Sequence, residues 1–384
     1  MSVLTITEQC TGCRACEQLC IKNAIEMTYD AEGFLTAKID NIKCVNCGLC
    51  RKICPQNNEQ SQNAPKNVFA VRLKDDEVLQ HSASGGAFAG IATEILKNGG
   101  IVFGVEYDIQ WNAQFVRITD LQDLCTIQSS KYVQADTLNS FANVQTLLKD
   151  GKTVLYAGTG CQIGGLKAFL KCDYPNLITV DLICHGVTSP LLFRKYIEWL
   201  DLNEDGKILE YNFRDKSIGW GLDYLTKTRT RTKTRSCGLD PYYYHFLKGD
   251  MYRECCYKCK YAKQARPGDF TIGDFWGIAK EHPDFFSDKG ISCILLNTDK
   301  AIALWANLQS RFHSVESTFE KVSRHNGNLL APTVRPQNRD GIYDSISVDN
   351  DGLWFNRFAK KFKPSLKARI KSLLPIWLLK LLKK

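Results

Sequence analysis

Two quartets of cysteines near the start of the chain constrain its fold more than any other feature. Both quartets have the spacing Cys-x2-Cys-x2-Cys-x3-Cys, and their members are Cys10, Cys13, Cys16 and Cys20, then Cys44, Cys47, Cys50 and Cys54. Three cysteines spaced in this way wrap around three corners of an iron–sulfur cubane, while the fourth points toward a second cluster. Zinc sites usually separate their cysteine pairs by a longer spacer. We therefore expect two 4Fe-4S clusters, one held by Cys10, Cys13, Cys16 and Cys54 and the other by Cys44, Cys47, Cys50 and Cys20.

This segment resembles a bacterial two-cluster ferredoxin over about the first 60 residues. Pro55 follows Cys54 as in such ferredoxins, whereas Ile21 stands where the first run would have proline. Two short strands are expected at residues 24–27 and 34–39, joined around Asp30 and Gly33. The resemblance implies an α+β ferredoxin-like dicluster domain at residues 1–60 that relays single electrons.

The chain as a whole has the composition of an ordinary globular protein. Its 384 residues are 44% hydrophobic and 24% charged, which allows two or three domains with proper cores. The 17 cysteines are an odd number, which argues against a framework made only of disulfides. Residues 1–9 show no apolar signal segment. Together these features predict a cytoplasmic protein in a reducing compartment.

The net charge of +9 is concentrated at the C-terminal end. Ten bases and no acid lie after Asp351, so the remainder is close to neutral and no nucleic-acid-binding face is expected. Residues 364–384 show apolar side chains at helical spacing among lysines, which predicts a basic amphipathic helix. The helix could lie on an anionic membrane surface at the cytoplasmic face, or pack on its own domain or a partner. Its apolar runs are too short to span a bilayer.

A polar linker at residues 61–67 is expected to precede an α/β core with a mixed sheet at residues 68–325. A strand at 68–73 leads to Ser84, Gly85 and Gly86, which precede a helix at 87–97 and a strand at 101–105. Glycines at a helix start let backbone N–H groups approach a phosphate. The alternative is a plain helix cap with no ligand.

Four further cysteines form a second metal-compatible pattern. Cys161 follows an expected strand at 153–157, and Cys184 follows one at 177–183, where parallel sheets bind ligands. Cys256 and Cys259 have the spacing Cys-x2-Cys and would complete a four-thiolate site. Two alternatives stay open: Cys161 and Cys184 could be small buried apolar residues, and Cys255 could replace Cys256 as the partner of Cys259.

Five bases alternate strictly with threonines from Lys227 to Arg235. On one strand they would share a face. Such a face could receive an anionic group or an acidic electron-transfer partner, or it could be a solvated strand or hairpin.

Several longer stretches resemble the coenzyme F420 (deazaflavin) hydrogenase/dehydrogenase beta-subunit family. These are SASGGAFAG, SSKYVQAD, LYAGTGCQIGGLKAFL, VDLICHGVTSP, CCYKCKYA and DFTIGDFWG, between residues 82 and 277. The resemblance implies a flavin, usually FAD, beside a third 4Fe-4S cluster. The implied cluster ligands are Cys161, Cys184, Cys256 and Cys259. The implied flavin contacts are Ser84, Gly85, Gly86, Ser130, Lys131 and Tyr132.

Clusters carry one electron at a time, whereas a flavin exchanges one or two and can pass hydride to an organic compound. The expected protein is therefore an iron–sulfur flavoprotein oxidoreductase that exchanges electrons with a ferredoxin or a similar partner. Its expected substrate is a small molecule or glycan, such as a surface-polysaccharide intermediate or a deazaflavin. The alternative is a non-catalytic electron-transfer subunit that links a ferredoxin pool to a partner enzyme. Residues 326–384 form a C-terminal extension in either case.

Overall fold

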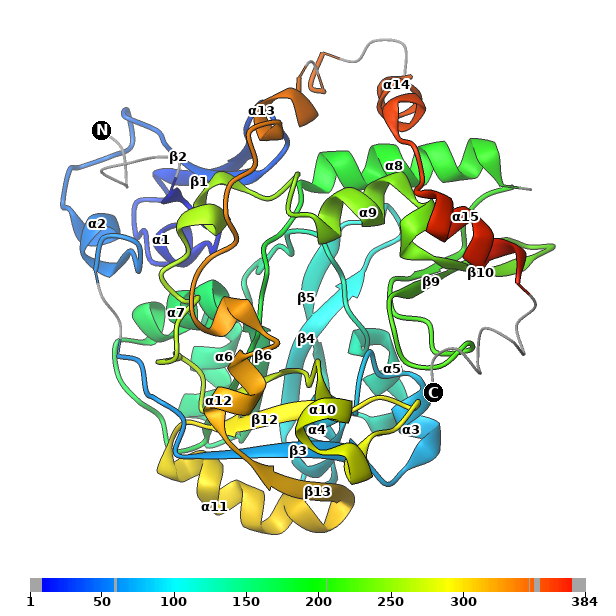
Figure 1. Ribbon diagram of the computed structural model, residues 1–384. Coiled ribbons are helices and arrows are strands. Elements are labelled where there is room, and N and C mark those ends of the chain that lie inside the picture. The colour runs from blue at the N-terminus through cyan, green and yellow to red at the C-terminus, as the bar shows by residue number, and fades with distance from the viewer. Residues whose placement is uncertain (1–8, 59–60, 205, 345, 349–352, 375–384) are drawn as a thin grey trace.

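A mixed sheet of eight strands forms the centre of the fold. The computed structural model describes residues 9–58, 61–204, 206–344, 346–348 and 353–374. The strand order across the sheet is β13-β3-β12-β11-β7-β6-β4-β5 (Figure 1). The strands are β3 (Asn67–Leu73), β4 (Ile101–Tyr107), β5 (Ala113–Ile118), β6 (Val154–Thr159), β7 (Leu177–Leu182), β11 (Phe270–Asp274), β12 (Ser292–Leu296) and β13 (Phe312–Ser317). Strands β4, β6, β7 and β11 are parallel to one another, and the outer strands pair antiparallel.

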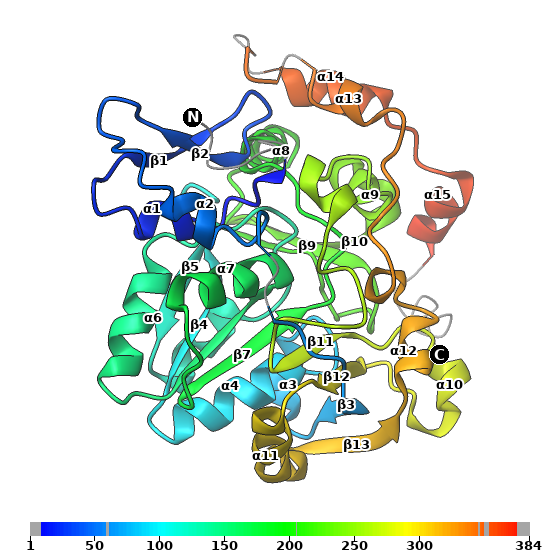
Figure 2. The same ribbon diagram turned by 90° about the vertical axis from the view of Figure 1, so that its left-hand side faces the viewer.

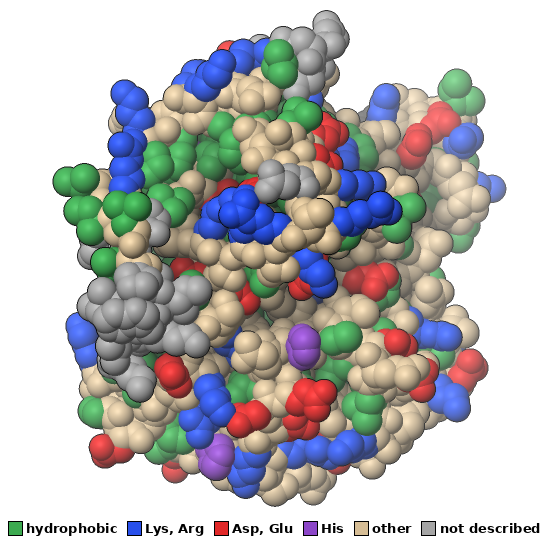
Figure 3. All heavy atoms as spheres, turned by 90° about the vertical axis from the view of Figure 1, so that its right-hand side faces the viewer, with side chains coloured by type: hydrophobic (Ala, Val, Ile, Leu, Met, Phe, Trp, Pro, Cys, Tyr) green, Lys and Arg blue, Asp and Glu red, His purple; other side chains and the backbone are tan. Residues whose placement is uncertain are grey.

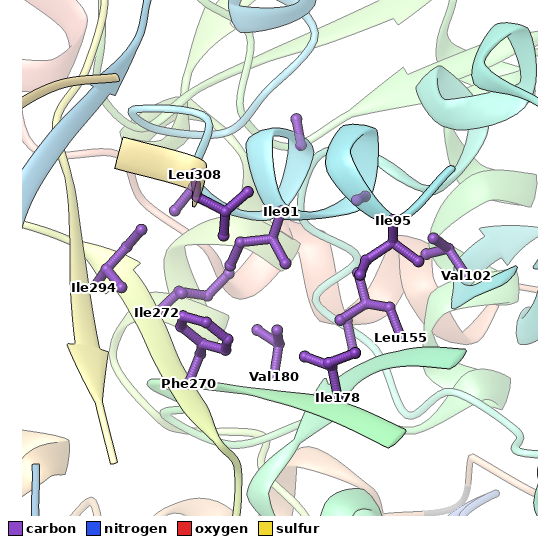
Figure 4. Close-up of a cluster of buried hydrophobic side chains, with 14 of the residues drawn as sticks. Ile91, Ile95, Val102, Leu155, Ile178, Val180, Phe270, Ile272, Ile294 and Leu308 are labelled. Carbon is purple, nitrogen blue, oxygen red and sulfur yellow. The ribbon is translucent and has the colours of Figure 1, made fainter. Parts of the chain in front are cut away.

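Helices cover both faces of this sheet because successive strand residues point to opposite sides. On one face α4 (Ala87–Lys97), α5 (Leu124–Ile127) and α11 (Asp299–Leu308) pack on residues such as Leu155 and Val180. Figure 4 shows Ile91 and Ile95 of α4 directed at this layer. On the other face α6 (Ser140–Lys149) and α7 (Gly160–Leu170) pack on Val154 and Tyr156. The core is thus a three-layer α/β unit.

The N-terminal cysteine segment forms a small unit of its own. It contains α1 (Ala15–Gln18), the antiparallel hairpin β1 (Ile25–Tyr29) and β2 (Leu35–Ile39), and α2 (Leu49–Ile53). Both Figure 1 and Figure 2 place α1 beside α7. Ala15 and Ile53 are buried in the same apolar cluster as α6 and α7. The dicluster unit is therefore packed on the core rather than held by a free tether.

Polar contacts reinforce this packing. Arg14 forms a two-pronged ion pair with Asp136, with 2.7 Å between Nη2 and Oδ2. The Gln134 side chain accepts from Leu35 N at 2.9 Å. These contacts fix the orientation of the N-terminal unit on the core.

The expected elements agree with the structure. The strands at 24–27, 34–39, 68–73, 101–105, 153–157 and 177–183 correspond to β1, β2, β3, β4, β6 and β7. Helix α4 spans the expected residues. Helix α8 (Pro190–Asn203) begins after Ser189, whose Oγ accepts from Leu192 N. The α+β dicluster domain followed by an α/β core with a mixed sheet is confirmed.

An aromatic cluster forms a second core beside the large sheet. It combines α8 and α9 (Pro241–Leu247) with a three-stranded sheet of β8 (Glu210–Asn212), β9 (Asp223–Lys227) and β10 (Thr232–Ser236). The alternating bases from Lys227 to Arg235 span the β9–β10 hairpin instead of one strand. Lys233 and Arg235 both pair with Glu204, whose side chain is 6% exposed. This part of the basic run is therefore neutralised internally.

Two helices follow toward the C-terminal end. Helix α14 (Trp354–Lys361) packs on α8 through Phe355, and α15 (Leu366–Leu373) lies beside β10. The expected amphipathic helix at 364–384 is described only up to residue 374, and its remainder lies outside the described residues. Among the helices that the structure describes, none is long and apolar enough to cross a membrane.

Candidate functional site

The two cysteine loops of the dicluster unit have the same local backbone. In each loop the second residue after the first cysteine is left-handed: Gly12 has φ 70° and Asn46 has φ 57°. The residue after the second cysteine is also left-handed, with φ 59° at Arg14 and 73° at Gly48. These turns direct N–H groups at sulfur, as from Gly12 to Cys10 Sγ and from Asn46 to Cys44 Sγ, both at 3.4 Å. Such hydrogen bonds are typical of iron–sulfur ligand loops.

The fourth cysteine of the second quartet lies with the first quartet. A small cavity is lined by Cys10, Cys13, Cys16 and Cys54, together with apolar residues that include Met27 and Ala37. Burial is the main cause that raises the pKa of Cys13 to about 12, and nearby Cys54 and Cys10 contribute to this rise. Metal ligands must be deprotonated, and a bound cationic cluster would favour the thiolate forms of these cysteines.

The other proposed set is more open to solvent. Cys44, Cys47 and Cys50 interact electrostatically, and Cys47 is exposed. Cys20 and Cys50 both pack against Ile25 and Cys54. Of these four cysteines, only Cys47 is exposed, and the other three are half-buried.

Three chain segments bring the downstream cysteines together. Cys161 lies in the first turn of α7, Cys184 follows β7, and Cys256 and Cys259 lie in and just after the turn η4 (Glu254–Lys258). Burial raises the pKa of Cys161, and Cys259, Cys184 and Cys255 add to this rise. Cys256 in turn interacts with Cys255, Cys184 and Cys259. Cys255 therefore lies beside Cys161, Cys184 and Cys259, whereas Cys256 lies beside Cys184 and Cys259.

A buried ion pair holds the loop that carries these cysteines. Arg266 Nη2 lies 2.7 Å from Asp181 Oδ1, and the two side chains are 2% and 0% exposed. Arg266 also donates to the carbonyl oxygens of Tyr261 and Leu182. The guanidinium charge lowers the pKa of Cys184 and Cys259, against the larger rise caused by burial. It therefore favours the thiolate forms that a metal cluster requires.

The cysteine spacing differs from that of a site for a single ion. Among the described residues, no group of three or more His, Cys, Asp or Glu side chains is arranged to hold one metal ion. A zinc ion draws its thiolates to about 2.3 Å. A cubane binds one thiolate at each of its four iron corners, so its ligands stand farther apart.

A cavity of about 510 Å³ opens at the carboxyl ends of the parallel strands. The cavity wall includes residues from all four parallel strands or from the loops that follow them. These residues are Val105 in β4, Thr159 in β6, Cys184 just after β7 and Asp274 in β11. Small-molecule and cofactor sites have volumes of roughly 300–1,000 Å³, and in parallel sheets they lie at this edge. Cys184 thus belongs both to the four-thiol site and to the cavity wall.

Of the first group of expected flavin contacts, two line this cavity. Ser84 and Gly86 are in its wall, and Gly86 begins α4 with φ 78° and no side-chain cap. The uncapped N-terminus of α4 therefore suits an anionic group. Gly85 has a packing role instead: a Cβ there would lie 2.3 Å from Val71 O and 2.4 Å from Ser292 N.

All three members of the second group line the cavity: Ser130, Lys131 and Tyr132. The Lys131 ammonium donates to Thr126 O at 3.1 Å and Gln128 O at 2.6 Å. Burial lowers the pKa of Lys131 to about 7, opposed by nearby Glu106 and Cys125. The Tyr132 ring stacks on Phe246, with 4.4 Å between ring centroids.

The cavity also contains residues that the sequence did not single out, above all Arg214. Its guanidinium forms a two-pronged pair with Asp274 at 2.7 and 2.8 Å and donates to Tyr132 Oη. Trp276, stacked on Trp220, lies under the same guanidinium. Asp274 and Trp276 belong to a recognisable motif, whereas Arg214 lies in an irregular segment without local signal. Only the tertiary fold reveals this pair.

Comparison with known proteins agrees with the two-part architecture. Residues 9–58 match the 4Fe-4S dicluster domain family, and residues 151–319 match the family described as the C terminus of the coenzyme F420 hydrogenase/dehydrogenase beta subunit. A solved structure of the F420-reducing [NiFe] hydrogenase complex from Methanosarcina barkeri has a chain that is similar with a TM-score of 0.47 and 16% identity. That match covers 66% of this chain and 83% of the other.

Two curated relatives match different parts of the chain. An uncharacterized protein of Methanocaldococcus jannaschii is 24% identical over 242 residues, covering 52% of this chain and 64% of the relative. The B component of the ion-translocating oxidoreductase complex of Methanosarcina acetivorans is 49% identical over 47 residues, covering 12% of this chain and 16% of that component. The chain thus matches less than two thirds of either relative's length. It joins a segment similar to the 4Fe-4S dicluster domain, residues 9–58, to a segment similar to the C terminus of the coenzyme F420 hydrogenase/dehydrogenase beta subunit, residues 151–319.

Proposed function

We propose that the protein is an iron–sulfur flavoprotein oxidoreductase with three 4Fe-4S clusters and one FAD. Electrons would move between the dicluster domain, the third cluster and the flavin, which supplies hydride exchange with an organic substrate when bound. The observation that carries this proposal is the position of Cys184. This residue lies in the wall of the 510 Å³ cavity and beside Cys161 and Cys259.

Different residues would hold the third cluster and the flavin. The four cysteines Cys161, Cys184, Cys256 and Cys259 would hold the third cluster. The N-terminus of α4 and Lys131 offer positive potential for the phosphates of the flavin. Tyr132 and Phe246 offer an aromatic wall. The surface of the cavity wall is mostly apolar, which suits a flavin ring.

The substrate and the partners belong to the same proposal. A ferredoxin or a similar carrier would exchange electrons at the exposed side of the dicluster unit, where Cys47 is accessible. A small molecule or glycan, such as a surface-polysaccharide intermediate or a deazaflavin, would enter the cavity. The proposed domains are residues 1–60, a linker at 61–67, a core at 68–325 and an extension at 326–384.

A non-catalytic electron-transfer role is the competing function. A protein with that role would need the dicluster domain but no cofactor cavity. The cavity and its shared wall with Cys184 favour the enzyme.

A peripheral membrane contact at the cytoplasmic face is a second proposal, carried by α15. Leu366, Ile370 and Leu373 are 73%, 53% and 84% exposed and recur at helical spacing. Figure 3 shows Lys and Arg side chains across the face that carries β10 and α15. An exposed apolar stripe among bases suits an anionic lipid surface.

Anaerobic purification followed by iron, sulfide and flavin assays tests the main proposal. We expect about twelve irons, about twelve sulfides and one FAD per chain, because three cubanes each carry four irons. About eight irons without flavin would instead identify the non-catalytic electron-transfer role.

Adjacent cysteines allow a matched test of the third cluster. Cys256→Ser removes a proposed ligand and should lower the iron content by about four atoms per chain. Cys255→Ser changes a neighbouring thiol in the same turn and should leave the iron content unchanged. The reverse result would show that Cys255 is the ligand. If the iron content is unchanged in both variants, the proposed third cluster is refuted.

The lowered pKa of Lys131 predicts that flavin binding depends on pH. Its pKa of about 7 in the free protein would rise beside an anionic ligand, so the free and bound forms both carry the proton below pH 7. FAD affinity should therefore be highest and constant below pH 7 and should fall as the pH rises above it. Lys131→Met should weaken binding at pH 6 by roughly tenfold, as for loss of a charge-assisted hydrogen bond, and remove the pH dependence. Fluorescence titration of the flavin-depleted protein measures both effects, and an unchanged pH profile in the variant would contradict the role of Lys131.

Sedimentation with vesicles tests the membrane proposal. Phosphatidylserine-containing vesicles should bind the protein at low salt and release it at high salt, because screening weakens surface electrostatics. Ile370→Glu should reduce binding, whereas Leu202→Glu, which alters an apolar residue that is 72% exposed on α8, should not. Binding that survives both Ile370→Glu and deletion of residues 364–384 would refute the contact.

A further inference from the structure

Tyr261 lies between the cysteines of the dicluster unit and the downstream cysteines. The residue follows Cys259 by two positions and is 2% exposed. Its ring lies against the glycine side of α7: a Cβ at Gly164 would come within 2.2 Å of the Tyr261 oxygen. At the next position, a Cβ at Gly165 would lie 3.0 Å from Cys13 Sγ. Because Gly164 and Gly165 have no side chains, α7 leaves room for the Tyr261 ring at the first position and for Cys13 at the second.

The surroundings of the phenol contain cysteines from both sites. Burial raises the pKa of Tyr261, and the nearby thiols of Cys161, Cys13, Cys259 and Cys54 raise it further. The preceding residue, Lys260, donates to Pro55 O at 2.7 Å and Gln56 O at 3.1 Å. The loop that carries Tyr261 is thus bonded directly to the end of the dicluster unit.

The Tyr261 hydroxyl has no hydrogen-bond partner among the described residues. Leaving a buried hydroxyl unpaired costs about 1–3 kcal/mol, so such a group calls for an explanation. Tyr107 and Tyr243 also have buried hydroxyls without a partner in the described chain. However, burial alone raises the pKa of Tyr107, with no cysteine nearby. Tyr261 is distinguished by its position among four proposed cluster ligands.

We propose that the Tyr261 hydroxyl donates a hydrogen bond to a sulfur of the third cluster and raises the reduction potential of that cluster. The inference rests on the proposed function, because the acceptor is a cluster held by Cys161 and its partners. A hydrogen bond to sulfur stabilises the more negative, reduced state. Tyr261 is therefore a positioning and tuning residue at the passage between the dicluster unit and the third site. A higher potential there favours arrival of an electron from the dicluster side.

The test is Tyr261→Phe in the full chain, purified anaerobically. The substitution removes only the hydroxyl and keeps the ring that fills the space beside Gly164. Iron content should stay at about twelve atoms per chain. In a potentiometric titration followed by electron paramagnetic resonance, the midpoint potential of the third cluster should shift to a more negative value. The signal of that cluster is the one that disappears in Cys161→Ser.

Tyr107→Phe is the matched control, since it removes a buried unpaired hydroxyl away from the cysteines and should leave every midpoint potential unchanged. A third-cluster potential that is the same in wild type and Tyr261→Phe, at full iron content, would overturn the inference and leave the proposed function intact. A shift confined to another cluster would overturn the assignment of the acceptor. A wild-type protein with about eight irons would overturn both proposals.

Discussion

The buried ion pair between Arg266 and Asp181 holds the loop that carries Cys256 and Cys259 against the sheet. Asp181 lies on β7, and it also accepts from Gly268 N at 2.8 Å and from Thr271 Oγ1 at 3.0 Å. Arg266 closes the loop that carries Cys256, Cys259 and Tyr261, and its backbone pairs with Asn63 of the linker. Because removing one member of a buried pair leaves an uncompensated charge, at a cost of about 3–5 kcal/mol, the arrangement is strongly specified.

Helix α7 contacts both the loop that Arg266 holds and the dicluster unit. Its first turn presents Cys161, its glycine side receives Tyr261 and Cys13, and its apolar residues join the core on which the dicluster unit rests. Helix N-termini favour thiolates, so the same turn that begins the helix also suits a cluster ligand. One helix thus forms the wall between two proposed cluster sites, and no long linker separates them.

Local patterns account for most of what the sequence could predict. The cysteine spacing, the short apolar strands and the helix at 87–97 each depend on neighbours in the chain, and the corresponding elements are present. The motifs around Ser84 and Lys131 were also located, and they line one cavity. Arg214 and Tyr261 were not, because their roles arise from partners that are distant in the chain. The contact of Gly85 with the backbone of β3 and β12 is likewise a tertiary property.

The charges around the cavity constrain how an anionic cofactor would lie in it. Arg214 is already paired with Asp274, and the ammonium of Lys216 is bonded to the carbonyl oxygens of Leu79, Ser84 and Lys289. Lys131 also donates to backbone carbonyls, and burial lowers its pKa to about 7, but unlike Lys216 it lines the cavity. Anionic groups are therefore favoured near Lys131 and the start of α4. A redox-active ring would then have the remaining wall, which includes Cys184, as its neighbour. The electrostatics and the position of the cysteine site thus favour the same orientation of the cofactor.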